Sequence, residues 1–157
     1  SKMKLADSII NHFTFSALTK KRIDLYGGLQ LRSFVSIDDL LLIYLKLIQS
    51  KDKLINKETF NVGYKNHSLE YISILIKTLV EEKIKKRIKI NYYGTNDVRS
   101  YTVNSDKVRK ILNIEFKTTI EKTVNELIRK YEKIPNKEKI YKKKYINKGL
   151  YLFKSFY

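Results

Sequence analysis

The chain has 157 residues, of which 43% are hydrophobic, and carries a formal net charge of +17 at pH 7. This length fits one domain or part of one, and the hydrophobic content is sufficient for a packed core, which argues against disorder of the whole chain. The absence of cysteine excludes disulfides and thiolate metal sites, and the longest apolar run, Leu40 to Ile48, is less than half of the roughly 20 residues that a membrane-spanning helix needs.

The first part of the chain predicts a helix followed by two strands. Asp7 to Leu18 carries apolar side chains at helical spacing. Ile23 to Tyr26 has the character of a strand, and the pair Gly27–Gly28 ends it. Arg32 to Ile37 is predicted as the second strand.

The next segment predicts a buried helix. Asp38 and Asp39 place negative charge where the dipole of a helix N-terminus favours it. From there to about Gln49 the helix is apolar on nearly every side, so we expect it to be buried between layers.

The rest of the folded part predicts three short strands and three capped helices. The first expected strand is Thr59–Gly63. Lys89–Tyr93 and Tyr101–Val103 are each expected as a short strand or an extended segment. The expected helices follow the capping residues Ser68 and Ser105 and the capping box Thr118–Glu121. Strands and helices alternate, so the fold class is α/β. Because the strands are few, short and irregularly spaced, they are typical of pieces that complete a sheet begun elsewhere.

The character of the chain changes at Pro135. We expect a domain over residues 1–134 and a basic aromatic tail over residues 135–157, where Lys137 to Lys148 is basic with interleaved tyrosines and Tyr151 to Tyr157 is aromatic. Three interpretations of the tail stay open: a solvated, weakly ordered segment, a segment docked on the domain, or a contact with an anionic surface.

The positive charge has two explanations. Lysines far outnumber arginines and are spread along the chain, whereas recognition of bases and phosphates relies on arginine forks and clustered patches. Lys, Ile, Asn and Tyr are also the residues that AT-rich codons supply. We therefore favour codon bias and expect no specific nucleic-acid partner, with a basic module for nucleic acid or anionic membranes as the alternative function. Since no segment has the layout of a signal peptide, we expect a soluble cytoplasmic protein.

Five short segments are more specific as an ordered set than any one of them alone. They are Ala6–Phe13, Ile23–Gly28, Gln30–Asp39, Phe60–Gly63, and Asp97–Tyr101 followed by Asp106–Leu112. From about Met3 to Tyr131, this order resembles the C-terminal half of the extended short-chain dehydrogenase/reductases, the NAD-dependent epimerase/dehydratase family that acts on nucleotide sugars. The chain departs from the family at Ser36, where many members carry His.

The resemblance implies a substrate-binding site for a nucleotide diphosphate. It implies that Asn11 meets the pyrophosphate and that the strand containing Tyr26 packs on the base. Tyr26 could stack on the base or bond a ribose, and Gln30 could touch the sugar. Arg32 and Arg99, two of six arginines, would bind phosphate oxygens through paired donors that lysine lacks.

Each of these residues also has a purely structural alternative. Arg32 could pair with Asp38 or Asp39, and Arg99 could pair with Asp97. Tyr26 could belong to the core, Asn11 could make only local bonds on its helix, and Gln30 could contact no ligand. The sequence leaves both interpretations open.

The catalytic motifs of the family are missing. Its members hold NAD or NADP on a Gly-rich turn and move a proton with a Tyr-x-x-x-Lys pair, but the five glycines here form no such turn and no tyrosine has a lysine four residues on. His12 and His67 lack metal-ligand spacing. We therefore expect a nucleotide-sugar-binding fragment that holds no cofactor alone and is not catalytic alone.

A separate N-terminal Rossmann half is a conceivable partner of such a fragment. The chain would then be the interaction half of a split enzyme, in which a strand such as Phe60 to Gly63 adds to a sheet of the partner.

Overall fold

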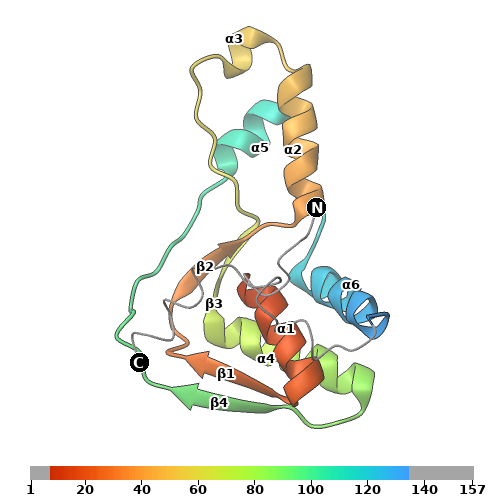
Figure 1. Ribbon diagram of the computed structural model, residues 1–157. Helices are drawn as coiled ribbons and strands as arrows, with labels where there is room; N and C mark the ends of the chain where they lie inside the picture. Colours follow the sequence, from red (N-terminus) through yellow and green to blue (C-terminus); the bar gives the residue numbers. More distant parts are fainter. Residues whose placement is uncertain (1–7, 135–157) are drawn as a thin grey trace.

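The computed structural model describes residues 8–134. The elements, in chain order, are α1 (Ile9–Lys20), β1 (Arg22–Tyr26), β2 (Leu31–Phe34), α2 (Ile37–Gln49), α3 (Asp52–Ile55), β3 (Lys65–Ser68), α4 (Leu69–Ile84), β4 (Lys89–Tyr93), α5 (Asp106–Leu112) and α6 (Ile120–Glu132) (Figure 1). The predicted α/β class with short strands, several helices and an incomplete sheet is confirmed.

The strands form two separate two-stranded sheets among the described residues. β1 and β4 are parallel, with Arg22 opposite Lys89 and Tyr26 opposite Tyr93. β2 and β3 are antiparallel, in a register that sets Arg32 opposite His67. Because β1 and β4 run the same way, the loops that follow them leave the sheet at the same edge.

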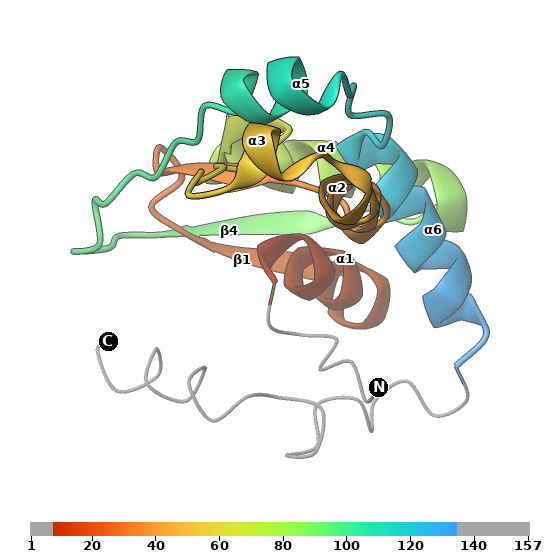
Figure 2. The ribbon, with the colours of Figure 1, turned by 90° about the horizontal axis from the view of Figure 1, so that it is seen from above.

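The main core lies where α1, α4 and α6 pack on one another and where α1 and α4 pack on β1 (Figure 2). Ile23 and Leu25 alternate with polar residues along β1 and are fully buried, as expected for a strand with one face on the core. Tyr131 of α6 is also buried there, and its ring meets Phe15 of α1 edge to face at 5.2 Å between ring centroids.

α2, α3 and α5 form an arm that extends from this body (Figure 1). Its own small core consists of Ile43, Val108, Leu112 and Ile114. The prediction that α2 is buried between layers was wrong, because only Asp39 and Ile43 of this helix are buried. α2 contacts α5 on one side, and large apolar side chains on its other side face solvent.

Three strand predictions need correction. The strand predicted over Arg32 to Ile37 ends at Phe34, because Ser36 caps α2 by accepting a hydrogen bond from the Asp39 N–H at 3.0 Å. The strand predicted over Thr59–Gly63 is absent, and β3 begins two residues later. The strand predicted over Tyr101–Val103 is absent too, although the Tyr101 N–H donates to the Leu31 carbonyl at 2.9 Å.

One predicted helix cap is confirmed, and the other two need correction. Ser68 accepts a hydrogen bond from the backbone N–H of Tyr71, as predicted. The N-cap of α6 is Thr119, which accepts from the backbone N–H of Lys122, one residue after the Thr118 of the predicted capping box. Ser105 stands before α5 but makes no side-chain cap. Its buried hydroxyl instead accepts from the Gly63 N–H at 2.7 Å and donates to the Gly63 carbonyl at 2.8 Å.

A buried carboxylate ties the arm to the body. Asp39 of α2 accepts hydrogen bonds from the backbone N–H groups of Lys117, at 3.2 Å, and Thr118, at 3.1 Å, just before α6. We predict that Asp39→Ala lowers the free energy of unfolding by about 1–3 kcal/mol, because two donors lose a charged acceptor. Urea unfolding followed by circular dichroism measures the loss. The control is Asp38→Ala, an exposed neighbour in the same helical turn, and an equal loss in both variants would contradict the role of Asp39.

Candidate functional site

Two loops meet at the carboxyl ends of β1 and β4. The loop over residues 27–30 follows β1, and the loop over residues 94–100 follows β4. The parallel pairing continues one step into the loops, since the Gly27 N–H donates to the Tyr93 carbonyl at 2.9 Å. The carboxyl edge of parallel strands is where open α/β sheets bind their ligands. The edge therefore qualifies as a candidate site on topology alone.

The first loop turns sharply because of two glycines. Gly27 has φ +74° and Gly28 has φ +131°, both in the region that other residues avoid. A Cβ added to Gly27 would lie 2.3 Å from the Nε2 of Gln30, so the turn also lacks room for a side chain. The glycine pair brings Gln30 back against the end of β1.

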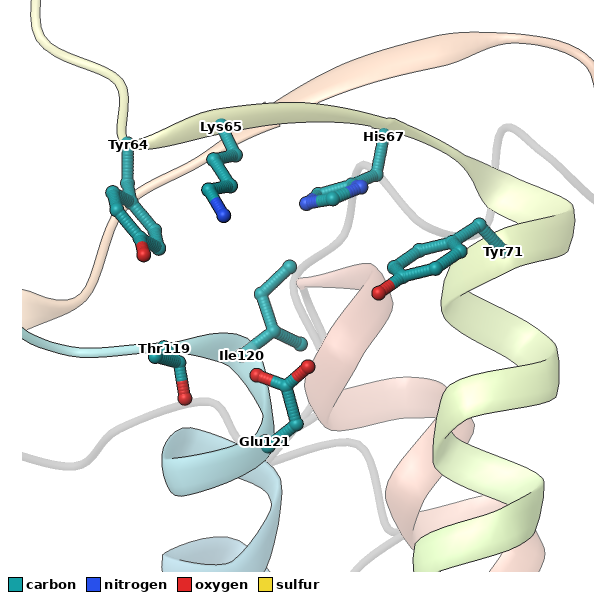
Figure 3. Close-up of a pocket in the computed structure, with 7 residues that line it drawn as sticks. All are labelled: Tyr64, Lys65, His67, Tyr71, Thr119, Ile120 and Glu121. Carbon is teal, nitrogen blue, oxygen red and sulfur yellow. The ribbon is translucent and has the colours of Figure 1, made fainter.

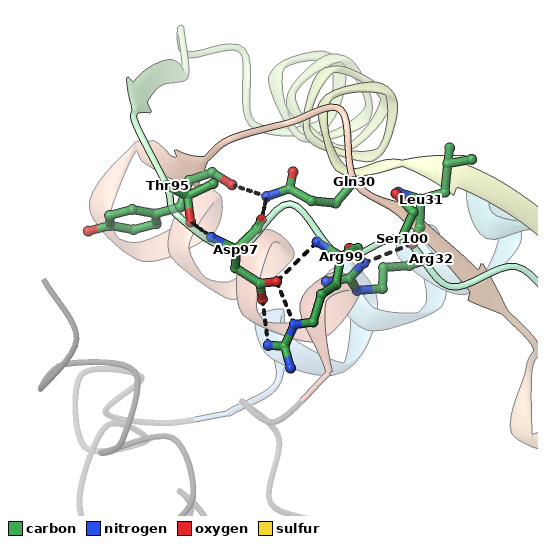
Figure 4. A network of polar contacts seen from close by, with 8 residues as sticks. Gln30, Leu31, Arg32, Thr95, Asp97, Arg99 and Ser100 are labelled. Atoms are coloured by element: carbon green, nitrogen blue, oxygen red, sulfur yellow. Dashed lines mark hydrogen bonds and ion pairs between the residues drawn. The ribbon is translucent and has the colours of Figure 1, made fainter.

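The buried amide of Gln30 joins the two loops. Its Oε1 accepts from the Gly28 N–H at 2.6 Å, and its Nε2 donates to the Tyr26 carbonyl at 3.3 Å. Its Nε2 also donates to the Asp97 carbonyl at 2.8 Å (Figure 4). All three partners of this side-chain amide are backbone groups. The contact across 67 residues of sequence fixes the second loop relative to β1.

Arg32 of β2 is held over the second loop with part of its guanidinium unused. Its Nη1 donates to the carbonyls of Leu31, at 2.9 Å, and Arg99, at 2.7 Å. Its Cζ lies 5.0 Å from the ring centroid of Tyr101, a cation–π distance. Its Nε and Nη2 donors have no hydrogen-bond partner within residues 8–134. The free edge of the guanidinium can accept an anion without breaking an existing bond.

Arg99 is paired with Asp97. Its Nε and Nη2 donate to the two carboxylate oxygens at 2.7 Å and 2.9 Å, and its side chain is 66% exposed (Figure 4). The hydrogen bond from Arg99 lowers the pKa of Asp97 from 3.8 to about 2, with a smaller contribution from the charge of Arg32. The same pair raises the pKa of Arg99. Both groups therefore stay charged at neutral pH.

The structure brings four of the five predicted site residues to this edge. Gln30, Arg32 and Arg99 share the network, and Tyr26 joins it through its carbonyl while its ring stacks on Tyr93 at 4.9 Å between centroids. Asn11 lies apart from the contacts of the network, in the first turn of α1, where its backbone N–H donates to the Ser8 hydroxyl.

The structural alternatives for the two arginines have opposite outcomes. Arg32 makes no ion pair with Asp38 or Asp39 among the described residues, so that alternative was wrong. The alternative pairing of Arg99 with Asp97 is confirmed. It leaves the Nη1 group of Arg99 outside the ion pair.

Sequence reasoning missed three residues of this edge. Tyr93 stacks on Tyr26, Tyr101 lies against the Arg32 guanidinium, and Ser100 accepts a hydrogen bond from the Leu31 N–H at 3.0 Å. Only the pairing of β1 with β4 reveals the first contact, because no local pattern relates residues so distant in sequence. The run Asp97–Tyr101 was singled out, but its contacts with β2 could not be inferred from it.

A hollow of about 170 Å³ lies apart from this network, between β3 and the starts of α4 and α6 (Figure 3). Its lining residues are Tyr64, Lys65, His67, Tyr71, Thr119, Ile120 and Glu121. The ring of His67 stacks on Tyr71 at 4.5 Å between centroids, and burial lowers the pKa of His67. Burial also lowers the pKa of His12. Neither histidine belongs to a cluster of three or more metal-ligand side chains in residues 8–134.

Neither a model of a protein family nor a curated protein sequence matches the chain. Solved structures do match. ADP-L-glycero-D-manno-heptose-6-epimerase of Helicobacter pylori matches 81% of this chain at 19% identity and a TM-score of 0.66, over 38% of its own length. UDP-glucose 4-epimerase of Thermotoga maritima, solved with UDP-glucose, matches 80% at 21% identity and a TM-score of 0.64, over 40% of its length.

A third match is the dTDP-glucose 4,6-dehydratase of Bacillus anthracis, solved in complex with NAD. The match covers 85% of this chain and 41% of the dehydratase chain, at 26% identity and a TM-score of 0.62. The chain thus spans about two fifths of the length of these structures. The resemblance to nucleotide-sugar epimerases and dehydratases is confirmed for the fold. No helix within residues 8–134 is long and apolar enough to cross a membrane.

We predict that Gln30→Glu destabilises the protein, because it replaces the Nε2 donor by an oxygen that faces the carbonyls of Tyr26 and Asp97. The expected loss at pH 7 is about 1–3 kcal/mol of unfolding free energy. The matched control is Gln49→Glu, the same change at an exposed position, for which we expect less than about 0.5 kcal/mol. If the two variants unfold at the same urea concentration, the amide of Gln30 does not join the loops.

The pair of Asp97 and Arg99 predicts a measurable titration. Since the folded pKa of Asp97 is depressed to about 2, its stabilising contribution is complete above pH 4 and is lost as the pH falls toward 2. In Arg99→Ala the Asp97 pKa should rise toward 3.8. Carboxyl-carbon NMR titrations of the wild type and the variant measure both values, and an unchanged Asp97 pKa would mean that the ion pair does not form in solution.

Proposed function

We propose that this chain is the substrate-binding part of a nucleotide-sugar epimerase or dehydratase, and that it holds the nucleotide diphosphate at the carboxyl edge of β1 and β4. The observation that carries the proposal is the placement of Arg32 and Arg99 in one network at that edge. The names of the matching structures support the same class of ligand, since one was solved with UDP-glucose.

Arg32 supplies the first contact to the ligand. Its Nη1 is anchored on two carbonyls and its plane lies near the Tyr101 ring, so little side-chain freedom remains to be lost on binding. The Nε and Nη2 donors then match two oxygens of a phosphate in the bidentate manner that makes arginine specific for such groups.

Arg99 supplies a second positive charge, on the residue whose backbone carbonyl holds the Arg32 guanidinium. Because Asp97 neutralises it in the free protein, a diphosphate binds either at the Nη1 group outside the ion pair or by displacing the carboxylate. The exposed pair of rings formed by Tyr26 and Tyr93 adds an apolar face beside the network, suited to a nucleotide base.

The glycine turn of this chain does not fit a dinucleotide cofactor. A dinucleotide-binding turn aims free backbone N–H groups at the pyrophosphate. Here the Gly27 N–H is bonded to the Tyr93 carbonyl and the Gly28 N–H to Gln30. We therefore assign to these residues the binding and orientation of substrate, a contribution to catalysis by proximity, and no step of hydride transfer.

Isothermal titration calorimetry with UDP-glucose tests the proposal. We predict weak binding by the wild type and at least a tenfold loss in Arg32→Ala/Arg99→Ala, because the paired phosphate donors are gone. The matched control is Arg87→Ala/Arg129→Ala, which removes the same charge from two exposed positions on other elements. Retained affinity in the Arg32/Arg99 variant would refute the site. Equal losses in both variants would show attraction by the overall charge of +17 alone.

A further inference from the structure

The hollow between β3 and the starts of α4 and α6 is separate from the nucleotide site. Its volume of about 170 Å³ lies below the range of about 300–1,000 Å³ typical of pockets for drug-sized molecules, so it suits a smaller ligand. Lys65 and His67 are two residues apart on β3 and therefore lie on one face of the strand. Tyr71 of α4 and Glu121 of α6 complete the lining from the other two elements (Figure 3).

Opposite charges face the hollow from opposing walls. The ammonium of Lys65 points into it from β3, and its Nζ lies 5.2 Å from the ring centroid of Tyr64 (Figure 3). The carboxylate of Glu121 points toward it from the first turn of α6. Within residues 8–134, no ion pair joins these two side chains or links either of them to another residue. The hollow therefore separates two unpaired charges.

The carboxylate of Glu121 has an unmet need for a donor. It is partly buried, and no group in the described part of the chain donates a hydrogen bond to it. A charge that is withdrawn from water without a partner is unfavourable. Glu81, which is buried to a similar degree, shows the usual arrangement, because it pairs with Lys77. A ligand with a positive group would supply the partner that Glu121 lacks.

The hollow also offers an apolar floor and a flat wall. The floor is Ile120, which is 6% exposed and belongs to the main core. The wall is the stack of His67 on Tyr71, with 4.5 Å between centroids and 10° between the ring planes. Burial and the charge of Lys65 lower the pKa of His67 more than the charge of Glu121 raises it, so the imidazole is mainly neutral at pH 7. Both surfaces suit an uncharged side chain of a ligand.

These features together favour a small zwitterion. We propose that the hollow binds a free α-amino acid with an apolar side chain. Its carboxylate contacts the ammonium of Lys65, its ammonium contacts the carboxylate of Glu121, and its side chain packs on Ile120 and the stacked rings. A ligand with only one of the two charges leaves the other charge of the hollow unpaired and is disfavoured. This site goes beyond the proposed nucleotide site and does not depend on it.

Titration of the full 157-residue chain with L-leucine, followed by ¹H–¹⁵N NMR, tests the site. Two analogues isolate the charges: 4-methylpentanoate lacks the ammonium of leucine, and 3-methylbutylamine lacks its carboxylate. We expect saturable shift changes at residues 64–71 and 119–121 with L-leucine, and about tenfold weaker binding of each analogue. Absence of saturable changes at these residues overturns the proposal. Equal affinity for L-leucine and 4-methylpentanoate overturns it as well, because the overall charge of +17 would then explain the attraction.

Two variants assign the contacts. Lys65→Met should abolish the preference for L-leucine over 3-methylbutylamine, and Glu121→Gln should abolish the preference for L-leucine over 4-methylpentanoate. The matched control is Glu82→Gln/Lys86→Met, which removes one charge of each sign from exposed positions outside the hollow and should keep both preferences. The amide spectrum of each variant shows whether it is folded. Preferences that persist in Lys65→Met and Glu121→Gln overturn the proposal.

The nucleotide site and the amino-acid site can be tested separately. Arg32→Ala/Arg99→Ala should bind L-leucine as the wild type does, because the hollow shares no residue with the network of the two arginines. Loss of L-leucine binding in this variant would place the amino acid at the carboxyl edge of β1 and β4 and overturn the site in the hollow. Failure of the wild type to bind UDP-glucose concerns the nucleotide site alone.

Discussion

The parallel pairing of β1 with β4 is the constraint on which the candidate site depends. Two strands whose paired residues are 67 positions apart place their carboxyl ends side by side, from Arg22 opposite Lys89 to Tyr26 opposite Tyr93. The loops that follow meet only because of this pairing, and Gln30 then fixes them with three hydrogen bonds to backbone groups. The second loop also brings the Arg99 carbonyl to the Arg32 guanidinium, which donates a hydrogen bond to it. A two-stranded sheet is marginal by itself, so the helices packed on β1 supply the stability that the geometry requires.

Local patterns in the sequence predicted where helices and turns form better than they predicted how those elements are buried and paired. The cap at Ser68 and the glycine pair after β1 depend on neighbouring residues, and both are found. The N-cap of α6 lies at Thr119, one residue after the start of the predicted capping box. The burial of α2 was not predictable from its composition, because an apolar helix can bury the side that packs on α5 and expose the other. The strand expected at Thr59–Gly63 failed because Gly63 is bonded to Ser105 instead of to another strand.

The site shows the same division between local and distant information. The resemblance identified Arg32, Arg99, Gln30 and Tyr26, and the structure gathers them at one edge. The residues that contact them could not be predicted from the sequence. The Tyr26–Tyr93 stack and the contact of Arg32 with Tyr101 join segments that are distant in sequence. Asn11 remains a prediction on α1, and the basic aromatic tail over residues 135–157 lies outside the described residues.

The carboxylate of Asp97 gives the candidate site a means of selection. A protein with a charge of +17 attracts anions of every kind, so attraction by itself distinguishes none of them. Arg99, however, already holds an internal anion with two good hydrogen bonds. A small anion with one charge gains little by replacing it, whereas a linker with two phosphates can engage Arg32 and still compete for Arg99. In the proposed function, the ion pair would thus set a threshold that favours ligands with two adjacent negative charges over those with one.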